Sequence, residues 1–149
     1  MIDRLQGLAS AGDVLAGEVT LPLARGIHAF AHGEYSEAVR HMAPLFGEPR
    51  LDQLSRIGGS HAQREVFEDT ILEAYLRAEH YPQAEAMLRA RLQRRESPRD
   101  LFWLGRAQLH SGQPTEAQAS LLQVSQRWQE ADADARECMT LHQLTAQAG

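Results

Sequence analysis

Residues 103–117, WLGRAQLHSGQPTEA, decide the fold of this chain. Gly105 stands twelve residues before Ala117, and the glycine and proline between them favour a tight turn. Apolar residues recur at helical spacing on both sides of that turn, which predicts a hairpin of two helices. We expect Gly105 to meet Ala117 across the hairpin, because small residues let two helix backbones approach closely.

The same pattern occurs twice more. Gly26 precedes Ala38 by twelve residues, and Leu72 precedes Ala84 by the same interval. The alanines of the second and third units are 33 residues apart, while those of the first and second are 46 apart, so the first interval carries an insertion. We therefore expect an all-α chain with one domain, residues 1–149, made of helical hairpins near 20–46, 61–95 and 98–129 and a capping helix at 132–147.

Turn residues mark the expected helix ends. Gly33 and Gly112 favour helix termination, because glycine readily adopts the left-handed backbone conformation. Ser36, Ser97 and Thr115 are expected to cap the following helices with their hydroxyl oxygens. Residues 2–15 are expected to form a further short helix.

The composition predicts a soluble folded chain without a preference for polyanions. The net charge is −5, all fifteen basic residues are arginine, and no basic cluster is interleaved with aromatic residues. Nucleic acid is therefore not an expected partner. No apolar run approaches the roughly 20 residues that cross a bilayer, and the first residues lack a signal layout, so we expect a cytoplasmic protein with no membrane partner.

Two segments resemble the tetratricopeptide repeat consensus. They are Trp103-Leu104-Gly105-x6-Gly112-x4-Ala117 and Tyr75-x5-Tyr81-x2-Ala84. Residues 56–67, RIGGSHAQREVF, are similar to a block of the family formed by tetratricopeptide repeat protein 38 and its bacterial relatives, and residues 19–98 follow the layout of the C-terminal part of those proteins. The resemblance implies a right-handed α-solenoid that acts as a scaffold, and it transfers no catalytic residue.

The block at residues 56–67 also has a reading from its own residues. Gly58 and Gly59 permit unusual backbone angles, and Ser60 can cap the helix that follows. Most of the block is explained as structural punctuation. Arg56, His61 and Arg64 form a candidate anchor for an anionic group near that helix start, but surface solvation or a structural ion pair is the simpler account of them.

Catalysis and metal binding have little support in the sequence. Ser60 and His61 are adjacent, so their side chains diverge, and no strand-turn-helix elbow surrounds the serine. His28 and His32 have the spacing of two metal ligands on one helix face, but no carboxylate motif accompanies them. Cys138 is the single cysteine of the sequence. We expect no enzyme activity and no cofactor or metal.

The expected function is a scaffold that binds a protein or peptide in a concave groove. One alternative is a structural or regulatory segment of a larger or oligomeric assembly, whose groove is filled by self-association. A weaker alternative is small-ligand binding near Gly58-Gly59. In the fold that the resemblance implies, the first helix of each hairpin lines the groove. Helical spacing selects one stripe on each of these helices, and the stripe of the first hairpin is apolar. The expected partner-binding residues are Asp69, Glu73, Arg77, Arg99, Phe102, Trp103, Arg106 and His110. For Phe102 and Trp103 a core position is the alternative.

Overall fold

The computed structural model describes residues 1–46, 61–128 and 136–148. All secondary-structure elements within these ranges are helical, which confirms the predicted all-α class. The chain divides into two compact units, Met1–Glu79 and His80–Gly149, and each is described by itself.

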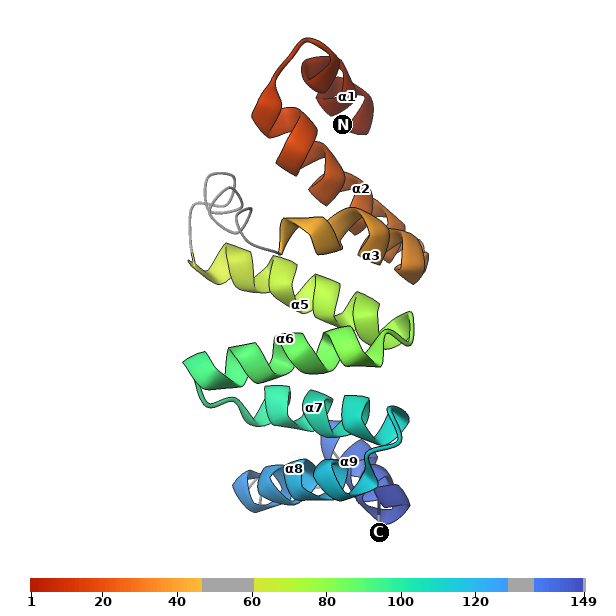
Figure 1. Cartoon of the computed structure of the whole chain (residues 1–149), viewed down its shortest axis with the longest axis vertical. Helices are drawn as coiled ribbons and strands as arrows, with labels where there is room; N and C mark the ends of the chain where they lie inside the picture. The colour runs from red at the N-terminus through yellow and green to blue at the C-terminus, as the bar shows by residue number, and fades with distance from the viewer. Residues whose placement is uncertain (47–60, 129–135, 149) are drawn as a thin grey trace. The chain divides into compact units, whose positions relative to one another are not determined.

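The first unit contains a hairpin of two antiparallel helices, α2 and α3, preceded by the short helix expected near the N-terminus (Figure 1). Packing in this unit joins α1 to η1, α2 to α3 and α3 to α5. The elements in chain order are α1 (Ile2–Ser10), the π-helical turn η1 (Ala16–Thr20), α2 (Leu21–Ala31), α3 (Tyr35–Met42), the 3-10 turn η2 (Ala43–Leu45) and α5 (His61–Arg77).

The wide turn η1 ends two residues before Pro22. Proline lacks an N–H group, and its ring collides with the carbonyl four residues earlier in a regular α-helix. A π-helical turn relieves that collision by adding one residue to the turn. The wide turn also places Gly17 close to α1, where a Cβ on Gly17 would lie 3.4 Å from the Cβ of Ala9. The helix that carries the first hairpin therefore begins before the predicted residue 20.

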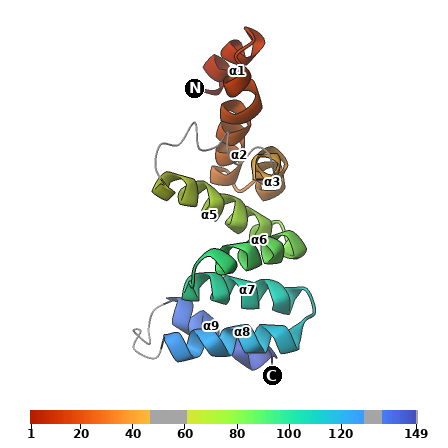
Figure 2. The same ribbon diagram turned by 60° about the vertical axis from the view of Figure 1, so that its left-hand side comes forward.

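The second unit places α9 against the α7–α8 hairpin (Figures 1 and 2). Helix α6 packs on α7, and α7 and α8 run antiparallel on either side of a short turn. The capping helix was predicted at 132–147, and the part of it that lies within the described residues begins at Arg136. The helices of this unit are α6 (Tyr81–Arg94), α7 (Pro98–His110), α8 (Pro114–Arg127) and α9 (Arg136–Ala148).

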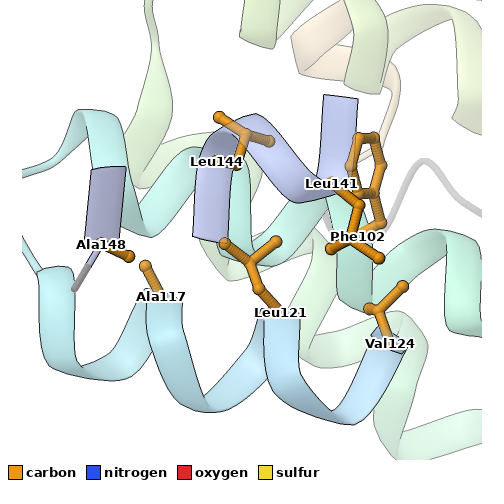
Figure 3. Close-up of a cluster of buried hydrophobic side chains, with 7 residues drawn as sticks. All are labelled: Phe102, Ala117, Leu121, Val124, Leu141, Leu144 and Ala148. Carbon is orange, nitrogen blue, oxygen red and sulfur yellow. The ribbon is translucent and has the colours of Figure 1, made fainter. Parts of the chain in front are cut away.

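A buried apolar cluster holds α7, α8 and α9 together (Figure 3). Phe102 of α7 lies beside Leu141 of α9, and Ala148 at the end of α9 lies next to Ala117 of α8. Leu121 and Val124 of α8 are fully buried in this cluster, so the stripe that α8 turns inward is closed to water. The members of the cluster are Phe102, Ala117, Leu121, Val124, Leu141, Leu144 and Ala148.

Three turns of the chain share one backbone geometry. Gly33, Glu79 and Gly112 have φ angles of 76°, 60° and 74°, and each stands five residues before the alanine of its unit. After Gly33, the amide of Glu34 donates to the carbonyl of Ala29 at 2.9 Å. After Gly112, the amide of Gln113 donates to the carbonyl of Gln108 at the same distance. These bonds belong to the Schellman type of helix end.

The helices that follow these turns also begin alike. The amides of Ala38, Ala84 and Ala117 donate to the carbonyls four residues earlier at 2.9, 3.1 and 3.0 Å. The residues at those carbonyls have similar backbone angles, with ψ of 63°, 56° and 66°. The periodicity of the sequence is thus a periodicity of the backbone.

The predicted close approach is confirmed in both glycine-containing hairpins. A Cβ on Gly105 would lie 3.5 Å from the carbonyl oxygen of Ala117 and 2.7 Å from Leu121, one turn further along α8. A Cβ on Gly26 would lie 3.3 Å from the carbonyl oxygen of Ala38 and would collide with the side chain of Met42, again one turn further. The two hairpins therefore use the same register.

Two of the three predicted caps are wrong. Ser36 and Thr115 are each the second residue of a helix, and neither α3 nor α8 has a side-chain hydrogen bond at its cap. The left-handed residue before each helix fixes the chain path, so the helix begins earlier than the hydroxyl residue. Ser97 is confirmed, since its oxygen accepts a hydrogen bond from the amide of Asp100 at 3.1 Å.

Candidate interaction surface

The N-terminus of α7 is fixed by a buried ion pair. Arg91 at the end of α6 donates from Nε and Nη2 to the two carboxylate oxygens of Asp100, at 3.0 and 3.2 Å. Their side chains are only 3% and 1% exposed. The sequence analysis did not predict this pair. The available signal was an acid in the first turn of a helix that follows an arginine-rich helix end.

A polar network fixes the opposite end of α7. Glu85 of α6 accepts hydrogen bonds from Arg89 at 2.7 Å and from the side-chain amide of Gln113 at 3.0 Å. The buried amide of Gln108 lies 2.8 Å from the hydroxyl of Ser120 on α8. When the NH2 group of Gln108 is turned toward Ser120, the side-chain oxygen of Gln108 accepts a hydrogen bond from Arg89 at 3.3 Å. Polar bonds thus join α6, α7 and α8.

Four of the predicted partner-binding residues lie along one side of α7. We call Arg99, Trp103, Arg106 and His110 the α7 stripe. At about 100° per residue they fall within about 60° of the helix circumference. Arg99 and His110 are exposed and Trp103 and Arg106 are half-buried, whereas most other residues of α7 are buried. The structure therefore brings these four together on the accessible side of the helix.

Trp103 is held from two directions. Part of its ring packs against the cluster of Figure 3. The guanidinium carbon of Arg99 lies 4.3 Å from the ring centroid, within the range of a cation–π contact. The ring is thereby fixed in orientation while part of it remains accessible.

Arg106 follows Trp103 at helical spacing on the same side. It is half-buried, and it makes no hydrogen bond or ion pair with another described residue. Arginine carries five N–H donors in a planar fork that matches a carboxylate. A half-buried guanidinium without an acceptor is therefore a favourable position for an incoming anion.

His110 is the last residue of the α7 stripe, and it makes a contact of a kind that recurs in the other unit. Its ring stacks on Tyr81, the first residue of α6, with centroids 5.0 Å apart and planes 11° apart. In the first unit, the guanidinium of Arg77 lies 5.7 Å from the ring of Tyr35, the first residue of α3. Both pairs have the same positions relative to the repeat alanines. In both units, the tyrosine that begins one helix therefore contacts the last residue of the next α-helix in the chain.

Phe102 is not a surface residue, and its prediction as a partner-binding residue is wrong. Its side chain is 3% exposed, in the core beneath α9. Its ring centroid lies 5.6 Å from that of Trp128. The alternative noted from the sequence is correct for Phe102, whereas the adjacent Trp103 points to the accessible side.

Three predicted residues lie on α5 in the first unit. Arg77 donates from Nε to Glu73 at 2.8 Å, and this hydrogen bond is the main reason that the pKa of Arg77 is raised. Asp69 and Glu73 are half-buried and one turn apart. Because they belong to a different unit from the α7 stripe, a groove that joins both sets stays a prediction.

The proposed anion anchor is described only at Arg64. Arg56 and the Gly58-Gly59 insertion lie outside the described residues, as does the side chain of His61. Arg64 is half-buried on α5. The anchor therefore stays a prediction.

The described residues offer no strong metal site. Among them, no group of three or more histidine, cysteine or acidic residues could hold a metal ion. His28 and His32 stack with centroids 4.2 Å apart, and Nδ1 of His32 lies 2.8 Å from the carbonyl oxygen of His28. In the portion of the chain that is described, no helix is long and apolar enough to cross a membrane.

No protein-family model, no curated protein and no solved structure matches this chain.

Proposed function

We propose that this chain is a helical repeat protein of the tetratricopeptide type, an α-solenoid that binds a protein partner and catalyses no reaction. Three features support the repeat assignment: the common backbone of the three turns, the equal register of the two glycine contacts, and the recurring tyrosine contact. Repeat proteins of this kind bind partners on extended surfaces built from corresponding helices.

One observation supports the site. Trp103 is partly accessible and is fixed by Arg99. Arg106 follows on the same face, and its guanidinium makes no ion pair within the described part of the chain. Interface energy concentrates in aromatic and arginine residues that are ordered before binding. The α7 stripe combines both residue types, and the buried pair beneath it fixes the helix that carries them.

The test is an affinity measurement with the full chain and any protein that it captures. We expect Arg106→Ala to weaken binding by about 2 kcal/mol, because it removes a charge-assisted contact. Arg40→Ala is the matched control, since Arg40 is an exposed arginine of the first unit that pairs with Glu37. A partner whose affinity is the same for wild type and Arg106→Ala would show that the α7 stripe is not the binding site.

A further inference from the structure

We propose that His28 and His32 form a two-histidine site at the C-terminal end of α2 that binds a divalent transition-metal ion of the copper(II) type. The site belongs to the first unit and goes beyond the proposed function, on which it does not depend. From the sequence alone no metal was expected here, because no carboxylate motif accompanies the two histidines. Three structural observations change that expectation: the accessibility of the rings, their mutual position and the orientation of one imidazole.

The two rings lie side by side on an accessible face of α2. Both residues are exposed, and their ring centroids are 4.2 Å apart with planes 26° apart. Two imidazole nitrogens that bind neighbouring positions of one metal ion, each at about 2 Å, are about 3 Å from each other. Small rotations of the two rings bring nitrogens of this stack to that separation, so one ion can contact both.

The orientation of His32 leaves its outer nitrogen able to bind a metal. Nδ1 of His32 lies 2.8 Å from the carbonyl oxygen of His28. Because a carbonyl oxygen can only accept, Nδ1 carries the proton, and Nε2 of the neutral ring carries the lone pair. A hydrogen bond from the second ring nitrogen to a backbone carbonyl is the arrangement that orients most metal-binding histidines. The ring of His32 is therefore held in the form that a metal ion requires.

The charges around the pair do not exclude a cation. The pair lies in the last turn and the C-cap of α2, near the negative end of the helix dipole. Arg25, the arginine of this helix, donates a hydrogen bond from its guanidinium to the side-chain oxygen of Gln6 on α1. The arginine closest to the pair in sequence is thus engaged with another helix.

The donor set selects the metal. Neutral imidazole suits copper, zinc and nickel, whereas magnesium and calcium prefer oxygen ligands. Cu²⁺ has the highest affinity of these ions for a given nitrogen site, and its tetragonal geometry accepts two neighbouring imidazoles with water in the other positions. No third histidine, cysteine or acidic ligand joins the pair within the described residues, so the site is a weak one that leaves positions open. We expect Cu²⁺ to bind more tightly than Zn²⁺, and Mg²⁺ not to bind.

The experiment titrates the full chain, first freed of metal with a chelator, with Cu²⁺ in a calorimeter. Pulsed electron paramagnetic resonance at less than one equivalent of copper counts the bound imidazoles. His28→Gln and His32→Gln each remove one ring. A third variant carries Ile27→His and His28→Gln, which keeps the number of histidines but places them five residues apart on different faces of the helix. Circular dichroism verifies that each variant is folded, and Cys138 is buried, so its thiol competes little for copper.

We expect the wild-type chain to bind copper with a two-imidazole signal. Each single variant should lower the affinity by at least about tenfold and leave a one-imidazole signal, because it removes a ligand. The variant with shifted histidines should behave like the single variants. Lowering the pH should weaken binding to the wild type, since protons compete for the same nitrogens.

Four results would overturn the proposal. The first is an absence of copper binding by the wild type, and the second is equal affinity for the wild type and the variant with shifted histidines. The third is a loss of affinity in only one of the two single variants. The fourth is a two-imidazole signal that survives His32→Gln, which would place the copper elsewhere. The α7 stripe is tested separately with a captured protein, so none of these results decides the proposed function.

Discussion

Gly105→Ala should destabilise the protein, although alanine is the better helix former. The added methyl group would lie 2.7 Å from both Cγ and Cδ2 of Leu121, where ordinary contacts begin at 3.4 Å. Leu121 is fully buried, so it has little room to move. Overpacking of this kind costs about 1–3 kcal/mol. The gain in helix propensity is about 1 kcal/mol, which leaves a net loss of up to about 2 kcal/mol.

Gly7→Ala provides the matched control. Gly7 also lies within a helix, α1, but a Cβ there would meet nothing within 4 Å. This substitution should therefore gain up to about 1 kcal/mol from propensity alone. The difference between the two variants isolates the overpacking. Urea unfolding followed by circular dichroism measures both, with the free energy of unfolding extrapolated to water.

The double variant Gly105→Ala, Leu121→Ala tests the cause. If the contact with Leu121 produces the loss, the combined effect should be smaller than the sum of the two single effects. A Gly105→Ala variant that is stabilised as much as Gly7→Ala would refute the close approach and, with it, the alignment of the repeats.

Three further predictions each concern a single residue. Glu79→Gly should raise the free energy of unfolding by about 1 kcal/mol, because Glu79 is held at φ 60° and this conformation is less favourable for other residues than for glycine. A lower melting temperature would contradict this prediction. Asp100→Ala should lower that free energy by about 3–5 kcal/mol, because it removes the carboxylate that pairs with the buried guanidinium of Arg91. Chemical denaturation checks the loss. Burial lowers the pKa of His41 below 6.5, with the nearby Arg40 as a second cause. The neutral form of His41 therefore stabilises the folded state fully above about pH 6.5, and this stabilisation is lost as pH falls through the folded-state pKa. His41→Gln should therefore lose less stability than wild type between about pH 7 and pH 5, and equal losses would show that His41 is not responsible.

The sequence predicted those features that depend on residues close together in the chain. The offset between Gly105 and Ala117 spans a single turn, so residue size and turn chemistry alone indicated the contact. Gly33 and Gly112 were recognised as turn residues because they are glycines. Glu79 adopts the same conformation but was not predicted to do so, because glutamate does not usually mark such a turn. Its position five residues before Ala84 was the available signal.

Features that depend on distant helices could not be predicted. Phe102 and Trp103 are adjacent aromatic residues, and α9, more than thirty residues later, decides which of them is buried. The pair of Arg91 and Asp100 was missed for a related reason. Charged residues are usually exposed, and their burial depends on how α6 packs against α7.

The common geometry of the three turns makes the hairpins exchangeable parts. The left-handed residues Glu79 and Gly112 are 33 residues apart, and each is followed by a residue of similar ψ and by a hydrogen-bonded alanine at the corresponding position. A recombination event that joined the chain before one turn to the chain after the other would therefore create no new loop and no strained junction. Such an exchange would remove or add a segment equivalent to α6 and α7, and so change the number of hairpins by one while keeping the geometry of the turn.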